Sequence, residues 1–128
     1  MVNSEKEAFV FFASTMLRYM DGKEFSACYL KIKRQVKMAG FSESYKDPDG
    51  VVKYFEIENG SEVCDVILDL YTITQTQPPI HKDWNKAVFT LYPDGKADME
   101  YIWDAEWQAR IDKYNAEAEA EKQKNRGK

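Results

Sequence analysis

The fold is decided by residues 84–103, which read WNKAVFTLYPDGKADMEYIW. Strand-like runs lie on both sides of the tetrad PDGK at residues 93–96. Alternation of apolar and polar side chains is the period of a half-buried strand. Because Asp-Gly between two such runs marks a hairpin, we predict a strand over residues 84–92, a turn, and a strand over residues 97–103.

Two helices are expected to flank this hairpin. Residues 61–74 have helical periodicity, and Pro-Pro at residues 78–79 ends any helix before the hairpin. The apolar stripe of this helix is formed by Val63, Ile67, Leu70 and Thr74. Asp104 is placed to cap a last helix over residues 105–122. Its apolar stripe is formed by Trp107, Ile111 and Tyr114. Residues 116–128 lack apolar anchors, so we expect a frayed tail there.

A third helix is expected at the N-terminus, ending at Asp-Gly in residues 21–22. Ser4 and Glu7 have the spacing of a capping box. The apolar stripe consists of Phe9, Phe12, Ala13, Met16, Leu17 and Met20. Val10 and Phe11 lie beside this stripe. We expect them to widen the buried face, the alternative being an apolar patch for a partner.

Three strands are expected between the first two helices. Residues 27–38 alternate as a strand that Gly40 breaks, and residues 41–46 form the next strand. The tetrad DPDG at residues 47–50 is a turn, because proline presets φ and glycine supplies positive φ. Residues 51–58 form the third strand.

The expected order is therefore α-β-β-β-α-β-β-α, in which strands occur in hairpin-linked groups. This order favours a single α+β domain over residues 1–128, with an antiparallel sheet of about five strands and three helices. A length of 128 residues fits one domain. Hydrophobic residues make up 44% and charged residues 31%, which excludes disorder of the whole chain. No apolar run approaches the roughly 20 residues of a membrane span, so we expect no membrane partner. Two cysteines are too few for a disulfide framework, so we expect a cytoplasmic protein.

Charge is distributed unevenly along the chain. The net charge is −4, and an acidic balance disfavours a nucleic-acid partner. Residues 51–112 carry five basic and twelve acidic groups, a balance of −7. Residues 1–50 carry eight and seven, and residues 113–128 carry five and three. If the acidic elements share a surface, it attracts a basic partner. The alternative is a solvated surface that maintains solubility.

No specific catalytic constellation is visible. His81, the one histidine, follows Pro-Pro in a loop, and Asp65 and Asp69 are i, i+4 on a helix, which is a common arrangement. No zinc-binding spacing occurs. Cys28 and Cys64 lie in apolar patterns, and we expect both to be reduced and buried. We therefore predict that the chain is not an enzyme and has no metal site, no catalytic residues and no cofactor.

The chain resembles a known family in its C-terminal half. Residues 84–96 (WNKAVFTLYPDGK) and 99–104 (MEYIWD), with the helix before them, Trp107 and Lys-Tyr at 113–114, are similar to the YezG-like immunity protein family. These proteins are antidotes in polymorphic toxin and contact-dependent growth inhibition systems. The resemblance implies an antitoxin that binds and blocks a cognate toxin domain, often a basic nuclease, without catalysis or cofactor.

Six residues are candidate contacts with such a toxin, because they combine acidic and aromatic character on the expected third and last strands. They are Tyr54, Glu56, Glu58, Asp98, Glu100 and Trp103. Alternation puts Asp98 and Glu100 on one face of the last strand and Trp103 on the other, so Asp98 and Trp103 cannot both serve one flat contact. The alternatives are a generic protein-interaction or adaptor domain, a small carboxylate-dependent hydrolase and a small-ligand binder. The oligomeric state stays open.

Overall fold

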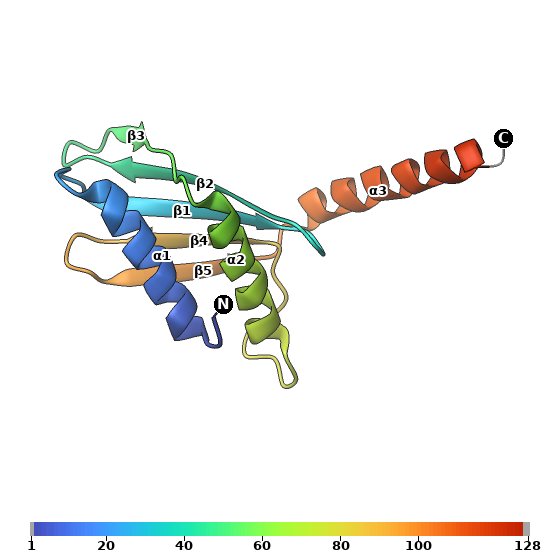
Figure 1. Ribbon diagram of the computed structural model, residues 1–128, viewed down its shortest axis with the longest axis horizontal. Coiled ribbons are helices and arrows are strands. Elements are labelled where there is room, and N and C mark those ends of the chain that lie inside the picture. The colour runs from blue at the N-terminus through green and yellow to red at the C-terminus, as the bar shows by residue number, and fades with distance from the viewer. Residues whose placement is uncertain (1, 127–128) are drawn as a thin grey trace.

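Three helices and five strands follow one another in the expected order in the computed structural model, which describes residues 2–126 (Figure 1). The elements are α1 (Glu5–Met20), β1 (Ala27–Arg34), β2 (Ala39–Lys46), β3 (Val52–Tyr54), α2 (Gly60–Gln75), β4 (Lys86–Leu91), β5 (Ala97–Ile102) and α3 (Ala105–Arg126). The α+β class and the C-terminal hairpin are confirmed. Among the described residues, no helix combines the length and apolarity that a membrane span requires.

The five strands form one antiparallel sheet in the order β3-β2-β1-β4-β5. β1 is central, and its Leu30 pairs with Glu43 of β2 on one side and with Phe89 of β4 on the other. The C-terminal hairpin therefore joins the N-terminal strands through the β1–β4 pairing, and the short β3 and β5 form the two edges.

The core lies between one face of the sheet and the two helices that cover it, α1 and α2 (Figure 1). Phe12 of α1 packs on Phe89 of β4 with ring centres 5.5 Å apart. The predicted stripe of α2 is buried as expected, and Trp84, just before β4, is fully buried. Burial of such large side chains contributes about 1.5–3 kcal/mol each to stability.

The end of β1 differs from the sequence prediction. The strand ends at Arg34, and the chain turns at residues 35–38, where the Gln35 amide donates to the Met38 carbonyl at 2.8 Å. Gly40 does not break the sheet, because it pairs with Lys33 inside β2. The buried Arg34 side chain continues the inward-facing row of β1 to the last residue of the strand. The strand ends there although the turn that follows contains no glycine or proline.

The buried face of α1 is also rotated from its predicted position. Ala8 and Thr15 are buried, whereas Leu17 is 47% and Val10 is 55% exposed. The prediction that Leu17 and Val10 belong to the buried face is therefore wrong. The reason is that α1 packs against α2 as well as the sheet. Phe11 is partly buried against the core. The capping bond is present, with the Glu7 amide donating to Ser4 Oγ at 3.1 Å.

α3 projects away from the sheet instead of packing on it (Figure 1). Trp107 and Ile111 are half-buried, but Tyr114 is 70% exposed, so the predicted stripe is buried only at its beginning. The helix continues to Arg126, through most of the segment that we expected to fray. Residues 127–128 of that segment lie outside the described residues.

Candidate functional site

One face of the sheet carries neither α1 nor α2, and we call it the open face (Figure 1). It is formed by alternate residues of the five strands, which the register aligns in rows across the sheet. One row runs through Tyr54, Ser44, Tyr29, Thr90 and Asp98. Two of the six candidate contact residues, Tyr54 and Asp98, therefore lie in the same row, at opposite edges of the sheet.

The charges on the open face are mixed. Lys31 and Lys33 project from the central β1, and Lys46 of β2 lies with its Nζ 5.8 Å from the centre of the Tyr29 ring. Asp98 and Glu100 occupy the β5 edge. Since adjacent strands are about 4.8 Å apart, the four steps from β3 to β5 separate Tyr54 from Asp98 by roughly 19 Å. The open face therefore presents basic groups at its centre and acidic groups along one edge.

A shallow hollow of about 280 Å³ lies on the open face, lined by Tyr29, Lys31, Ser44, Lys46, Val52 and Val88. Its lining combines two amines, two hydroxyl groups and two aliphatic side chains. Tyr54, which lies in the same cross-strand row as Ser44 and Tyr29, is 80% exposed. A flat face with shallow hollows and exposed aromatic side chains suits a protein partner better than a small ligand, which needs a more enclosing pocket.

Glu56 and Glu58 are not on a strand, which corrects the prediction of a strand over residues 51–58. β3 ends at Tyr54, because the chain turns to bury Ile57 and leads into α2. The Glu58 amide donates to the Tyr19 hydroxyl of α1 at 2.8 Å. Both carboxylates are exposed, but the alternation that grouped them with Tyr54 does not apply beyond the strand.

Trp103 lies on the other side of β5 from Asp98 and Glu100, as the alternation indicated. It is 47% exposed and lines an open hollow of about 400 Å³ together with His81, Lys82, Asp83, Met99 and Tyr101. Trp103 therefore cannot contact a partner on the open face together with Asp98. The acidic surplus of residues 51–112 is similarly divided, since exposed Glu62 and Asp65 lie on α2.

His81 is held by its neighbours and is half-buried instead of free in the loop. Its Nε2 lies 2.7 Å from Glu5 Oε2, and the Tyr101 hydroxyl donates to the same oxygen at 2.6 Å. Burial and this hydrogen bond raise the pKa of Tyr101. The contacts tie the start of α1 to β5 and to the loop before β4.

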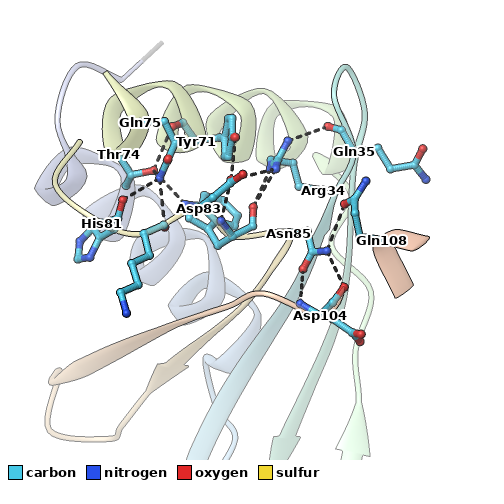
Figure 2. A network of polar contacts seen from close by, with 12 residues as sticks. Arg34, Gln35, Tyr71, Thr74, Gln75, His81, Asp83, Asn85, Asp104 and Gln108 are labelled. Carbon is cyan, nitrogen blue, oxygen red and sulfur yellow. Dashed lines mark hydrogen bonds and ion pairs between the residues drawn. The ribbon is translucent and has the colours of Figure 1, made fainter. Parts of the chain in front are cut away.

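Sequence reasoning missed a partly buried polar network beside this loop (Figure 2). Arg34, only 6% exposed, donates from Nε and Nη2 to the Trp84 carbonyl at 3.2 and 2.8 Å. Asp83 Oδ1 accepts from the Tyr71 hydroxyl and from the Trp84 amide, each at 2.8 Å. These groups come from β1, α2 and the loop, so spacing along the chain could not reveal them. Their hydrogen bonds hold the loop in place.

Burial or a hydrogen bond accounts for Asp69 and for both thiols. No group of three or more His, Cys, Asp or Glu side chains among residues 2–126 is placed to hold a metal ion. Asp69 Oδ2 instead accepts a hydrogen bond from the Val2 amide at 3.2 Å. Burial raises the pKa of the Cys28 thiol to about 12, which keeps it protonated at neutral pH. Cys64 is half-buried, not buried as expected, with its Sγ 3.2 Å from the Ala39 carbonyl.

Comparison of the chain with protein-family models and with curated proteins finds no match.

Proposed function

We propose that this chain is an immunity protein, an antitoxin that binds and neutralises a cognate toxin domain in the cytoplasm. The observation that carries the proposal is the cross-strand row from Tyr54 to Asp98 on a sheet face that α1 and α2 leave uncovered. Exposed tyrosines with charges of both signs are the composition of a protein interface. The resemblance of residues 84–104 to YezG-like immunity proteins supports a toxin as the partner.

The arrangement of charges suggests how a nuclease toxin would be held. Asp98 and Glu100 on the β5 edge attract the Lys and Arg side chains with which a nuclease binds phosphate. Lys31 of the central β1 and Lys46 at the end of β2 pair with acidic groups on the same partner. Complementarity of both signs fixes one orientation and speeds the encounter. The apolar area of Tyr54 then slows dissociation.

The enzyme alternative has less support than binding. A carboxylate hydrolase needs carboxylates and a base that converge in a pocket. His81 and Asp83 line one hollow, but His81 contacts Glu5, and Asp83 Oδ1 is occupied by Tyr71 and Trp84. A generic adaptor shares the binding argument and differs only in what it binds, so the experiment below separates the two.

The test is co-expression of the chain with the product of the gene immediately upstream, followed by affinity purification and a growth assay. We expect a stoichiometric complex and relief of toxicity. The variant Tyr54→Ala/Asp98→Lys/Glu100→Lys should lose at least roughly a hundredfold in affinity, since it removes an anchor and introduces like-charge contacts.

A matched control carries the same kinds of change on the helical side of the molecule, namely Leu17→Ala/Glu62→Lys/Asp65→Lys, at three exposed positions. This control should bind and protect like the natural sequence. Equal loss in both variants would contradict the assignment of the open face. A complex without relief of toxicity would favour the adaptor.

A further inference from the structure

The apolar stripe of α3 is only half-buried at its beginning, and its middle is exposed. It consists of Trp107, Ile111, Tyr114 and Ala118, with spacings of four, three and four residues. This is the spacing of a coiled-coil seam. Tyr114 is 70% exposed, and α3 as a whole runs away from the sheet (Figure 1). Helices in proteins gain most of their stability from packing of an apolar face, so an unpacked stripe indicates a surface for another helix.

The stripe forms one wall of a groove. The other wall is the turn between β1 and β2, where Val36 is 85% and Met38 66% exposed. A hollow of about 380 Å³ separates this turn from Ile111 and Asn115, and a second hollow of about 200 Å³ lies between Met38 and Trp107. The groove thus follows the first half of the stripe and has apolar side chains on both walls.

The direction of α3 is fixed by a buried side chain at its start. Asn85 is fully buried, and its Nδ2 donates to the Asp104 carbonyl at 2.9 Å and to Gln108 Oε1 at 3.2 Å (Figure 2). Its Oδ1 accepts from the Asp104 amide at 2.8 Å. Lys86 Nζ lies 2.7 Å from Asp104 Oδ2 and 5.2 Å from the centre of the Trp107 ring. These contacts present the stripe in one orientation, as a docking surface requires.

We propose that the groove binds α3 of a second copy of this chain, with the two helices antiparallel. The spacing of the stripe reads the same in both directions, so antiparallel pairing puts Trp107 opposite Ala118 of the second copy and Ile111 opposite Tyr114 of the second copy. Large then meets small in each outer layer, as good packing demands. Parallel pairing would put Trp107 against Trp107 and Ala118 against Ala118, which fills the seam unevenly.

The charges beside the stripe match the same arrangement. Arg110 and Glu117 lie on one flank of the stripe, because their positions on the helix are nearly equivalent at 3.6 residues per turn. Antiparallel pairing places Arg110 near Glu117 of the second copy, and the two-fold axis repeats the pair. Neither side chain forms an ion pair within the part of the chain that the structure describes. The opposite flank carries the uncharged Gln108 and Asn115, so nothing there opposes association.

The test is a charge swap, read by sedimentation velocity over a wide range of protein concentration. The seam is short, so we expect a weak, concentration-dependent dimer for the natural sequence. Arg110→Glu and Glu117→Arg should each raise the dimer dissociation constant about tenfold, since each creates two like-charge contacts. The double variant Arg110→Glu/Glu117→Arg should restore dimerisation.

Glu119→Arg is the matched control, because residue 119 lies on the far side of the helix from residue 117, and it should dimerise like the natural sequence. Circular dichroism shows whether each variant keeps its helix content. A natural sequence that stays monomeric at every concentration, or a double variant that stays as weak as the single variants, would overturn the proposal. Dimerisation does not depend on the toxin, so this result and the toxin-binding result are independent.

Discussion

The guanidinium carbon of Arg34 lies 3.4 Å from the centre of the Tyr71 ring, in a stack that joins β1 to α2. Burial lowers the pKa of Arg34, although its ordinary value is so high that the group stays charged. Burial and the hydrogen bond to Asp83 raise the pKa of Tyr71, which keeps its hydroxyl protonated as a donor. The stack and the two bonds from Arg34 to the Trp84 carbonyl hold the loop before β4 against the helical layer.

Arg34→Ala should lower the free energy of unfolding by about 3 kcal/mol, because it leaves the buried Trp84 carbonyl without its donors and removes the stack. Urea unfolding followed by tryptophan fluorescence measures the change. Lys33→Ala, at the exposed neighbouring position, should stay within about 0.5 kcal/mol of the natural sequence. Equal changes in the free energy of unfolding for the two variants would show that the Arg34 network does not stabilise the fold.

Thr74→Val should cost about 1–3 kcal/mol, because it leaves the indole Nε1 of Trp84 without the acceptor that lies 2.9 Å away. Trp84→Phe removes the donor and part of the ring. The double variant Thr74→Val/Trp84→Phe should be less destabilised than the sum of the two single variants, by about 1 kcal/mol. Strict additivity in urea unfolding would mean that this hydrogen bond does not stabilise the fold.

Acid should weaken the start of α3 through Asp104. The Lys86 ammonium and the Trp107 amide hold the pKa of Asp104 below its ordinary value. A carboxyl whose pKa is lower in the folded state stabilises the fold above its unfolded pKa of about 3.9, and this contribution is lost as the pH falls through the folded pKa. Stability measured across this range should therefore fall less steeply for Asp104→Asn than for the natural sequence.

Exposed Asp65 on α2 provides the comparison, and Asp65→Asn should keep the acid dependence of the natural sequence. High salt should reduce the difference between the natural sequence and Asp104→Asn, because the Lys86–Asp104 pair is partly exposed. If the stability of Asp104→Asn falls with pH as steeply as that of the natural sequence, the Asp104 carboxylate is not the source of the acid dependence.

The two thiols should differ in reactivity toward a disulfide reagent at mildly alkaline pH. Cys64 is half-buried and should react slowly in the folded protein, since burial also raises its pKa. Cys28 is fully buried, so it should react only as fast as the protein unfolds. Absorbance of the released thiolate follows both steps, and Cys64→Ser should abolish the first. Rapid labelling of Cys28 in the folded protein would contradict its burial.

Sequence patterns were sufficient where local chemistry decides the structure. Asp94-Gly95 marks the C-terminal hairpin, and Gly95 has the positive φ of 87° that the turn requires. The turn at residues 35–38 has no glycine, proline or asparagine, so local signals could not locate it. The exposure of Leu17 and Tyr114 depends on which neighbours pack beside each helix, and periodicity shows only that an apolar face exists.

The candidate site was predictable in part. Alternation correctly separated Trp103 from Asp98 and Glu100, because the side-chain period of a strand is strict. It failed at Glu56 and Glu58, where the chain leaves the sheet to bury Ile57. Lys31 and Lys46 belong to the open face through strand pairing, which joins segments far apart in the sequence. The mixed charge of the open face could therefore not be predicted from the sequence without the strand order.

The central position of β1 has a consequence for how the chain reaches its folded state. Cys28 pairs with Tyr45 in a local hairpin but also with Leu91, which lies about half the chain length further along the sequence. Non-local pairing of this kind slows folding, because loop-closure entropy is lost before the contact forms. During synthesis one edge of β1 stays unpaired until β4 has been made. The nascent N-terminal half therefore exposes a strand edge to which chaperones can bind and through which chains can aggregate.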